Sequence, residues 1–178
     1  CMVVAGLLGW VNSITKDKIA AITWEKTVTA MKEVISADDF SDAMDLTDDM
    51  TAAATAQGGT LAAVYQAQSG GQPIGYAINV ESSGSQGTIS MMVGIDMDGA
   101  VTGVSIVTNS ETSGIGTKVC GNKPNDDGVP VLDQFVGMSG AGTLKVGKTV
   151  TAISGATVST KGVTKGANAA LAAVAALG

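Results

Sequence analysis

GTISMMVGIDMDGAVTGVSIVTN, residues 87–109, contains two apolar segments separated by a short polar turn. Residues 87–96 and 100–109 are rich in Val, Ile and Met, and the Asp98-Gly99 pair between them is typical of tight β-hairpin turns. The preceding residues repeat the pattern, because LAAVYQAQ (61–68) and IGYAINVE (74–81) flank the turn sequence SGGQP. The sequence therefore predicts two hairpins and an antiparallel sheet in the middle of the chain.

Helical spacing occurs on both sides of these strands. We expect one helix over residues 13–35, where the apolar positions i, i+4, i+7 and i+11 are Trp24, Val28, Met31 and Ile35. We expect a second from Thr160 to the end of the chain, where the apolar residues are Val163, Ala167, Ala170, Leu171, Val174 and Leu177. Clustered strands with flanking helices predict an α+β domain.

The remaining segments give weaker patterns. VLDQFVG (131–137) predicts a short helix, TLKVG (143–147) and VTAI (150–153) predict short strands, and TAAATAQGGT (51–60) is typical of a connector. Residues 36–50 include six aspartates but lack the Gly and the final Glu of a calcium-binding EF-hand loop. We interpret them as a solvated helix or loop rich in capping residues.

The N-terminal sequence CMVVAGLLGWV, residues 1–11, is apolar and uncharged. It is shorter than the about 20 residues that span a bilayer. We expect residues 1–12 to be the C-terminal part of a transmembrane helix, 13–50 a juxtamembrane helix with an acidic connector, and 51–178 one further domain. A buried N-terminal helix or strand of a soluble protein and a lipoprotein that begins at Cys1 are the alternatives.

Composition excludes several function classes. The formal charge of −6 and the pI near 4.4 argue against binding to nucleic acid, which requires a basic surface. The chain contains no histidine, which removes Ser-His-Asp chemistry and histidine-bearing zinc sites. Its two cysteines, Cys1 and Cys120, are too few for a four-thiolate zinc site, and their sequence context does not favour a disulfide. We predict no metal site.

Two segments have compositions that suit a binding site. In TAISGATVST, residues 151–160, small hydroxyl residues and one Gly lie between a strand-like segment and a helix. In SETSGIGTK, residues 110–118, a carboxylate, hydroxyls and two glycines follow a strand. Both patterns are typical of ordinary turns and helix caps. The first also suits a phosphate at a helix N-terminus, and the second offers a carboxylate, hydroxyls and close backbone approach for a flat ring. The residue types alone leave the two interpretations open.

SGATVST and SETSGIGTK together resemble the FMN-binding domain of the Rnf complex G subunit and of the related C subunit of the sodium-pumping NADH:quinone reductase. The family consensus fragments are S-G-A-T and E-T-P-G-L-G. The resemblance extends through GYAINV, VGIDMDGAVTGVSIV and LDQFVG, and back to NSITKDKI, so it covers nearly the whole chain. The short span between motifs is more similar to the Rnf protein.

The resemblance implies a covalent cofactor. Thr157 corresponds to the Thr of S-G-A-T, whose hydroxyl a separate flavin transferase esterifies to the phosphate of FMN. Ser154, Gly155 and Ala156 are expected to shape the turn. The residues expected along the flavin are Glu111, Thr112, Gly114 and Gly116, with Thr117 and Lys118 nearby.

The resemblance also implies a place in the cell. We expect a single-pass subunit in the cytoplasmic membrane of a bacterium or archaeon, with the flavin domain on the extracytoplasmic side. It would pass electrons within a ferredoxin:NAD+ oxidoreductase that transports Na+ or H+, beside the other membrane subunits of the Rnf complex. The alternatives are the quinone-reductase C subunit, with the same chemistry but other partners, and a non-redox, membrane-tethered assembly module.

Three positions depart from the family pattern. Thr151 replaces an Asp that belongs to the transferase recognition pattern, and Ser113 replaces the Pro of E-T-P-G-L-G. A Gly-rich aromatic stretch of the family is replaced by SSGSQGTISMMVG, residues 82–94. The first departure bears on the efficiency of flavin attachment, and the other two bear on packing around the ring.

Overall fold

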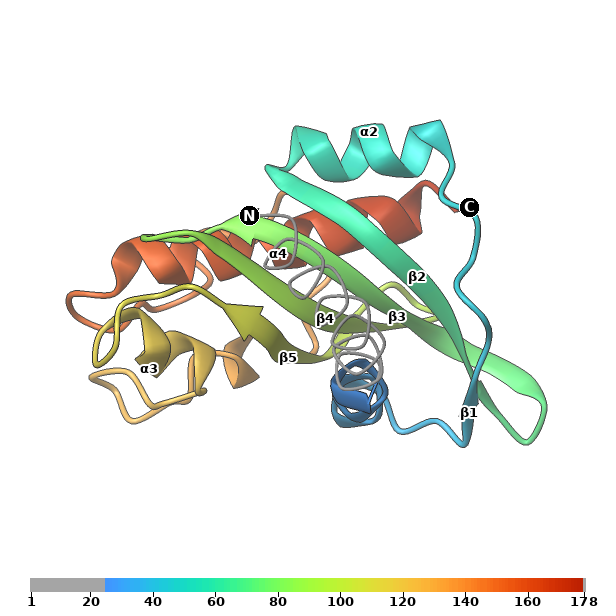
Figure 1. Ribbon diagram of the computed structural model, residues 1–178, viewed down its shortest axis with the longest axis horizontal. Coiled ribbons are helices and arrows are strands. Elements are labelled where there is room, and N and C mark those ends of the chain that lie inside the picture. Colours follow the sequence, from blue (N-terminus) through green and yellow to red (C-terminus); the bar gives the residue numbers. More distant parts are fainter. Residues whose placement is uncertain (1–24, 178) are drawn as a thin grey trace, which may run out of the picture.

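The computed structural model describes residues 25–177, and its centre is a five-stranded antiparallel sheet (Figure 1). The strands lie across the sheet in chain order: β1 (Asp39–Phe40), β2 (Gly59–Ser69), β3 (Gln72–Ser83), β4 (Thr88–Asp96) and β5 (Val101–Asn109). The other elements are α2 (Asp48–Ala56), α3 (Gly116–Cys120), the 3-10 helix η1 (Asp133–Phe135) and α4 (Thr157–Ala175). Residues 25–34 form a further helix. The α+β class and both predicted hairpins are confirmed.

The turn between β4 and β5 forms where the sequence predicts it. The Asp96 carboxylate accepts hydrogen bonds from the backbone N–H of Asp98 at 3.0 Å and of Ala100 at 2.8 Å. These bonds satisfy turn donors that have no partner in the strand ladder. The two strands then pair in antiparallel register from Ile95 and Val101 outward.

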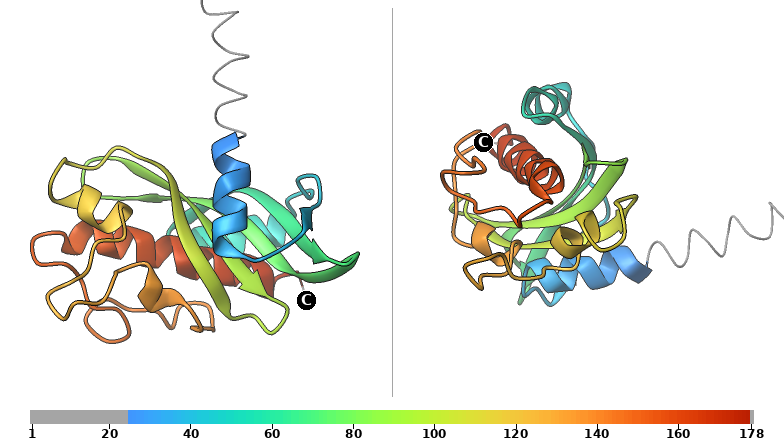
Figure 2. Two further views of the ribbon diagram at one scale, coloured as in Figure 1. Left: turned by 90° about the horizontal axis from the view of Figure 1, so that it is seen from below. Right: turned by 90° about the vertical axis from the view of Figure 1, so that its left-hand side faces the viewer.

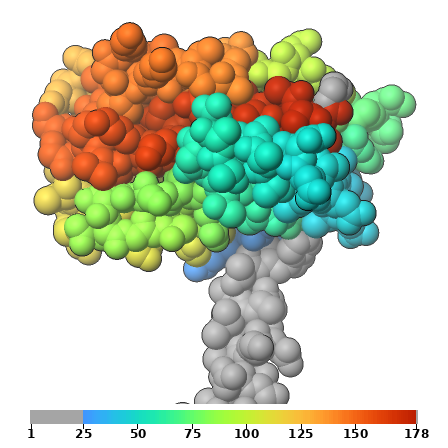
Figure 3. Space-filling view, turned by 90° about the horizontal axis from the view of Figure 1, so that it is seen from above, coloured from blue at the N-terminus to red at the C-terminus, as the bar shows by residue number. Residues whose placement is uncertain are grey.

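Helix α4 lies in the concave face of the curled sheet, against β2, β3 and β4 (Figure 2). Two glycines of α4 allow the close approach. A Cβ on Gly166 would lie 2.6 Å from Met91, and a Cβ on Gly162 would lie 2.7 Å from the Ser83 carbonyl oxygen. Helix α2 lies beside α4 on the surface of the molecule (Figure 3). The sheet therefore holds α4, and with it the segment that leads into α4, in one position.

The helix of residues 25–34 packs on the opposite face of the sheet. Paired glycines on β4 and β5 receive its last turn, because a Cβ on Gly94 would lie 2.3 Å from the Val34 oxygen and one on Gly103 would lie 2.9 Å from the Val34 Cα. The Thr102 hydroxyl donates to the same Val34 oxygen at 2.5 Å. The absence of side chains at Gly94 and Gly103 lets the last turn of this helix pack directly against the centre of the sheet.

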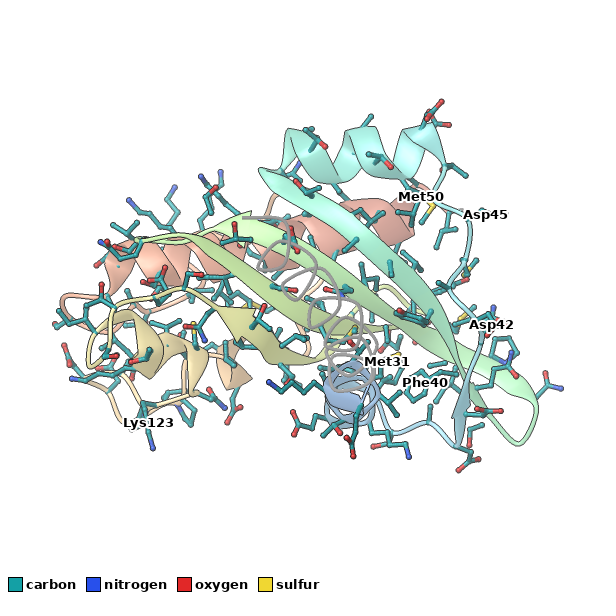
Figure 4. All side chains as sticks on the ribbon, in the orientation of Figure 1. Met31, Phe40, Asp42, Asp45, Met50 and Lys123 are labelled. Atoms are coloured by element: carbon teal, nitrogen blue, oxygen red, sulfur yellow. The ribbon has the colours of Figure 1, made fainter. Side chains whose placement is uncertain are left out.

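The sheet thus separates two apolar cores. Met50 of α2 belongs to the core on the α4 side and Met31 belongs to the core under the N-terminal helix, and the two side chains lie on opposite sides of the sheet (Figure 4). They are 0% and 1% exposed, and burial of such a side chain contributes about 1.5–3 kcal/mol. Strand β4 contributes to both cores, which explains its nearly continuous apolar sequence.

One local prediction is wrong, and another is confirmed with a shifted boundary. Residues 51–60 are not a connector, because α2 runs to Ala56 and β2 begins at Gly59. The Thr47 hydroxyl caps α2 by accepting from the Met50 N–H at 3.3 Å, and α4 supplies the surface on which the short helix packs. The predicted final helix is confirmed as α4, which begins at Thr157, three residues before the predicted start at Thr160.

The strands predicted at residues 143–147 and 150–153 are also absent from the described chain, where Val146 and Val150 form only an isolated bridge. The buried Asn168 side chain of α4 replaces a strand partner. Its amide oxygen accepts from the N–H of Gly142 and Leu144, at 2.9 and 3.3 Å, and its amide nitrogen donates to the Leu144 oxygen at 2.9 Å. These bonds satisfy backbone groups at the start of the first segment without a neighbouring strand, so the chain there remains an irregular loop.

The short helix predicted in VLDQFVG is confirmed as η1, and the helix predicted over 13–35 is helical from residue 25 to residue 34. The rest of that helix and the predicted membrane span at 1–12 lie outside the described residues. Within residues 25–177, no helix is long and apolar enough to cross a membrane.

Candidate functional site

The two segments singled out in the sequence meet at one end of the sheet, beside the N-terminus of α4 (Figure 1). Between them lies a cavity of about 170 Å³. Its lining combines three parts of the chain: Ser85 and Gln86 after β3, Glu111, Thr112, Ile115 and Gly116 after β5, and Gly155, Ala156, Val158 and Ser159 at the start of α4. Because each part follows or precedes a regular element, the fold fixes the cavity walls.

Glu111 joins all three parts. Its side chain is 8% exposed, and its carboxylate accepts from the backbone N–H of Ser85 at 2.7 Å and of Gln86 at 3.2 Å. The buried Ser159 hydroxyl donates to the other carboxylate oxygen. A Cβ on Gly116 would lie 2.2 Å from that oxygen, so the loop after β5 approaches the carboxylate as closely as glycine permits. Glu111 is therefore at least a structural link within the site.

The N-terminus of α4 offers free backbone donors. The N-cap residue is Ala156, which has no side-chain acceptor, and Gly155 before it has a φ of +81°. The N–H groups of Thr157, Val158 and Ser159 find no acceptor within the described residues. Three such donors and the positive end of a 19-residue helix favour a phosphate or another anion at this position.

Four hydroxyl groups occur between residues 154 and 160, and three of them are engaged. Ser154 is exposed and donates to the Asp126 carboxylate at 2.6 Å. Ser159 is 1% exposed and donates to Glu111, and Thr160 is 0% exposed and donates to the Ala156 oxygen at 3.0 Å. Thr157 is exposed, and its hydroxyl makes no hydrogen bond within residues 25–177. Thr157 is thus the accessible and uncommitted hydroxyl of this segment.

The loop that leads into α3 is ordered by its own hydrogen bonds. The Thr117 hydroxyl accepts from the Gly114 N–H at 2.9 Å, and the Thr112 oxygen accepts from the Thr117 N–H at 3.3 Å. Gly114, with a φ of +83°, and Lys118 are exposed, whereas Gly116 is buried under Glu111. The pattern SETSGIGTK is therefore a folded loop and the start of a short helix.

The structure brings the ten predicted site residues to one region, but only half of them line the cavity. Five line the cavity: Glu111, Thr112, Gly116, Gly155 and Ala156. The other five do not line it: Gly114, Thr117, Ser154 and Thr157 are each next to a lining residue along the chain, and Lys118 is two residues from Gly116.

Five further lining residues were not predicted from the sequence: Ser85, Gln86, Ile115, Val158 and Ser159. Ile115 and Val158 are unusual because they are apolar yet 51% and 57% exposed beside the cavity. Ile115 lies within SETSGIGTK and Val158 within TAISGATVST, so the two motifs themselves indicate that these residues are near the site. Ser85 and Gln86 belong to the stretch 82–94 whose departure from the family pattern bears on packing around the ring, but neither was predicted as an individual site residue.

Cys120, at the end of α3, is a free thiol and is partly buried. Burial, with a smaller contribution from the Glu111 charge, raises the pKa of this thiol to about 11. The thiol therefore stays protonated at neutral pH, which makes it a poor nucleophile and metal ligand. Cys1, the other cysteine, lies outside the described residues.

Comparisons with known proteins agree with this geometry. The model of the family described as the FMN-binding domain matches residues 84–172, which include the cavity and both motifs. The G subunit of the Na(+)-translocating ferredoxin:NAD(+) oxidoreductase complex of Acetobacterium woodii is 31% identical over 178 residues, which cover 93% of this chain and 82% of that protein. The G subunit of the ion-translocating oxidoreductase complex of Methanosarcina acetivorans is 31% identical over 167 residues, or 90% of this chain and 81% of that protein.

A third relative, the G subunit of the proton-translocating ferredoxin:NAD(+) oxidoreductase complex of Clostridium ljungdahlii, is 33% identical over 107 residues, which cover 60% of this chain and 57% of that protein. The fold, the cavity and the family match define an FMN-binding domain. The chain belongs to the family of G subunits of the ion-translocating oxidoreductase (Rnf) complexes.

Proposed function

We propose that this chain is an electron-transfer subunit that carries FMN esterified through its phosphate to the Thr157 hydroxyl. The observation that carries the proposal is the state of the hydroxyls in residues 154–160. Thr157 is exposed and makes no hydrogen bond in the described chain, while Ser159 and Thr160 are buried donors. An enzyme that attaches a group to this segment therefore meets one free hydroxyl directly at the helix N-terminus.

The surrounding residues suit a flavin phosphate. The free N–H groups of the first turn of α4 are hydrogen-bond donors for phosphate oxygens, and the helix dipole favours the negative charge. The cavity of about 170 Å³ accommodates only part of an FMN, because complete small-molecule pockets measure about 300–1,000 Å³. The exposed Ile115 and Val158 side chains extend the site as an apolar surface for a flat ring.

Attachment requires an activated flavin nucleotide, because free FMN has no good leaving group on its phosphate. The Thr157 oxygen attacks the phosphorus of a flavin dinucleotide held by the transferase. The new P–O bond to Thr157 forms as the phosphoanhydride bond breaks, the second nucleotide leaves with the bonding electrons, and the hydroxyl proton passes to a base or to water. The net change in the protein is the addition of one FMN minus one water.

Bound FMN supplies reversible one- and two-electron transfer, and the protein positions it. The relatives are named as subunits of oxidoreductase complexes, which supports the other membrane subunits of such a complex as partners. The relative named sodium-translocating is 31% identical to this chain, and the relative named proton-translocating is 33% identical over its shorter match. The proposal therefore leaves the coupling ion open. The free Thr157 hydroxyl weighs against the alternative of an assembly module without flavin.

The covalent link predicts that flavin stays with the unfolded chain. We expect full-length protein, produced with an active flavin transferase, to remain yellow and fluorescent after denaturation and gel filtration in urea. Mass spectrometry should locate one FMN minus water on the tryptic peptide that contains Thr157. Flavin that separates completely from the denatured chain would show non-covalent binding and reject the ester.

We also propose that residues preceding the described domain anchor it in the membrane, with the flavin on the extracytoplasmic side. The apolar residues 1–11 support the anchor, and the resemblance of the domain to extracytoplasmic flavin domains supports the side of the membrane. A reporter fused after Gly178 that matures only outside the cytoplasm should be active, and a reporter that works only in the cytoplasm should be silent. The reverse pattern would place the domain in the cytoplasm.

A further inference from the structure

The loop after α3 and the short helix η1 that follows it each contact the segment that leads into α4. The Gln134 side-chain amide pairs with both backbone groups of Thr151: its oxygen accepts from the Thr151 N–H at 2.8 Å, and its nitrogen donates to the Thr151 oxygen at 3.0 Å. The Asp126 carboxylate accepts from the Ser154 hydroxyl at 2.6 Å. We call Asp126 and Gln134 the clamp.

Both sides of the Gln134 contact are anchored in the core. Gln134 lies within η1 between Leu132, which is 4% exposed, and Phe135, which is 0% exposed. Thr151 lies between Val150 and Ile153, which are 1% and 5% exposed. The paired hydrogen bonds therefore connect two fixed pieces of backbone.

Asp126 is held by its neighbour. The side-chain oxygen of Asn125, a residue that is 7% exposed, accepts from the N–H groups of Asp127 and Val129, both at 3.0 Å. This arrangement orders the turn on both sides of Asp126. The carboxylate thus reaches Ser154 from a defined position.

The clamped residues continue directly into the attachment position. After Ser154 the chain turns through Gly155 and a hydrogen bond from the Ala156 N–H to the Ile153 oxygen at 2.9 Å, and Thr157 then begins α4. This turn connects the clamped residues to Thr157 over three residues. No residue of the clamp lines the cavity in the described chain, so the clamp does not act by touching a ligand there.

We propose that Asp126 and Gln134 are positioning residues that hold the Thr151–Ser154 segment so that the transferase receives the Thr157 hydroxyl in an attack-ready orientation. The inference rests on the proposed attachment at Thr157. The clamp contacts are on the protein surface, where hydrogen bonds contribute little to overall stability. Phosphoryl transfer, in contrast, is sensitive to displacements of the attacking oxygen of about 1 Å.

The test compares rates of flavin attachment in the full chain. Parent, Asp126→Ala, Gln134→Ala and the double variant are coexpressed with limiting flavin transferase, and the fraction of chains heavier by one FMN minus water is followed over time by intact mass. We expect the double variant to be labelled about 10-fold more slowly or worse, with a melting temperature close to that of the parent. Labelling of the folded double variant at the parental rate would overturn the proposal.

Two matched variants separate positioning from general damage. Asp127→Ala removes the same charge from the adjacent position, whose carboxylate makes no hydrogen bond within residues 25–177, and should be labelled like the parent. Asp126→Asn keeps an oxygen that accepts from Ser154 and should recover most of the rate lost in Asp126→Ala. Equal labelling rates for Asp126→Asn and Asp126→Ala would contradict the clamp, and so would equal losses of rate in Asp126→Ala and Asp127→Ala. These single variants test the proposal even if the double variant does not fold. A parent chain with no covalent flavin would instead refute the proposed function itself.

Discussion

Thr157→Ala protein should contain no covalent flavin when it is produced with an active transferase. Alanine has no oxygen to form the ester, and the neighbouring hydroxyls are poor substitutes for physical reasons. Ser159 and Thr160 are at most 1% exposed and donate to acceptors inside the fold, so their labelling requires the first turn of α4 to open. Ser154 is exposed but lies before the turn, several residues from the free N–H groups of α4.

The same substitution should leave the fold intact, because Thr157 is exposed and its hydroxyl makes no hydrogen bond in the described chain. Circular dichroism and thermal melting are therefore the control. Thr157→Ser keeps the oxygen at the same position and should retain part of the label. Full covalent flavin on well-folded Thr157→Ala protein, measured by intact mass, would refute attachment at this residue.

The sheet was predictable from sequence because its signals are local. Apolar runs and turn residues such as Asp98-Gly99 specify each hairpin within about ten residues, whereas the register shifts within the β4–β5 pair are not visible in the sequence. Helix α2 was not predicted, because its Ala- and Thr-rich sequence buries only Met50 and Ala54, and it depends on contact with α4 far along the chain. The irregular loop before residue 153 was misread for a similar reason, since distant side chains bond to its backbone: Asn168 at Gly142 and Leu144, and Gln134 at Thr151.

The site was predictable in its location but not in its internal connections. The family motifs identified Glu111 and Thr157, and the structure brings the two segments together. The partners of Glu111 are 25 to 48 residues away in sequence, so no local pattern indicates that its carboxylate holds Ser85, Gln86 and Ser159. The clamp contacts of Gln134 and Asp126 span 17 and 28 residues and are equally invisible in the sequence.

Glu111→Ala should be the most destabilising single substitution at this site. It leaves the Ser85 and Gln86 N–H groups and the buried Ser159 hydroxyl without their acceptor. An unsatisfied buried donor costs about 1–3 kcal/mol, and water that enters the vacated space recovers part of this. We therefore expect the free energy of unfolding of the full chain in urea to fall by about 2–4 kcal/mol.

Glu111→Gln should lower the free energy of unfolding by less than Glu111→Ala does, because the amide keeps one oxygen that accepts hydrogen bonds. It should still be less stable than the parent, because the amide NH2 group cannot accept from the donors that faced the second carboxylate oxygen. Glu81→Ala is the control, since Glu81 is an exposed acid on β3 whose side chain makes no hydrogen bond among the described residues. It should unfold like the parent.

The flavin provides a second measurement on the same Glu111→Ala protein. Thr157 belongs to α4, whose buried residues hold it on the sheet independently of Glu111, so the ester should still form. The cavity wall at Ser85, Gln86 and Gly116 loses the group that fixes it, and we expect the reduction potential or the visible spectrum of the attached flavin to shift. Parental stability together with an unchanged spectrum and potential would show that Glu111 neither holds the site together nor shapes the environment of the ring.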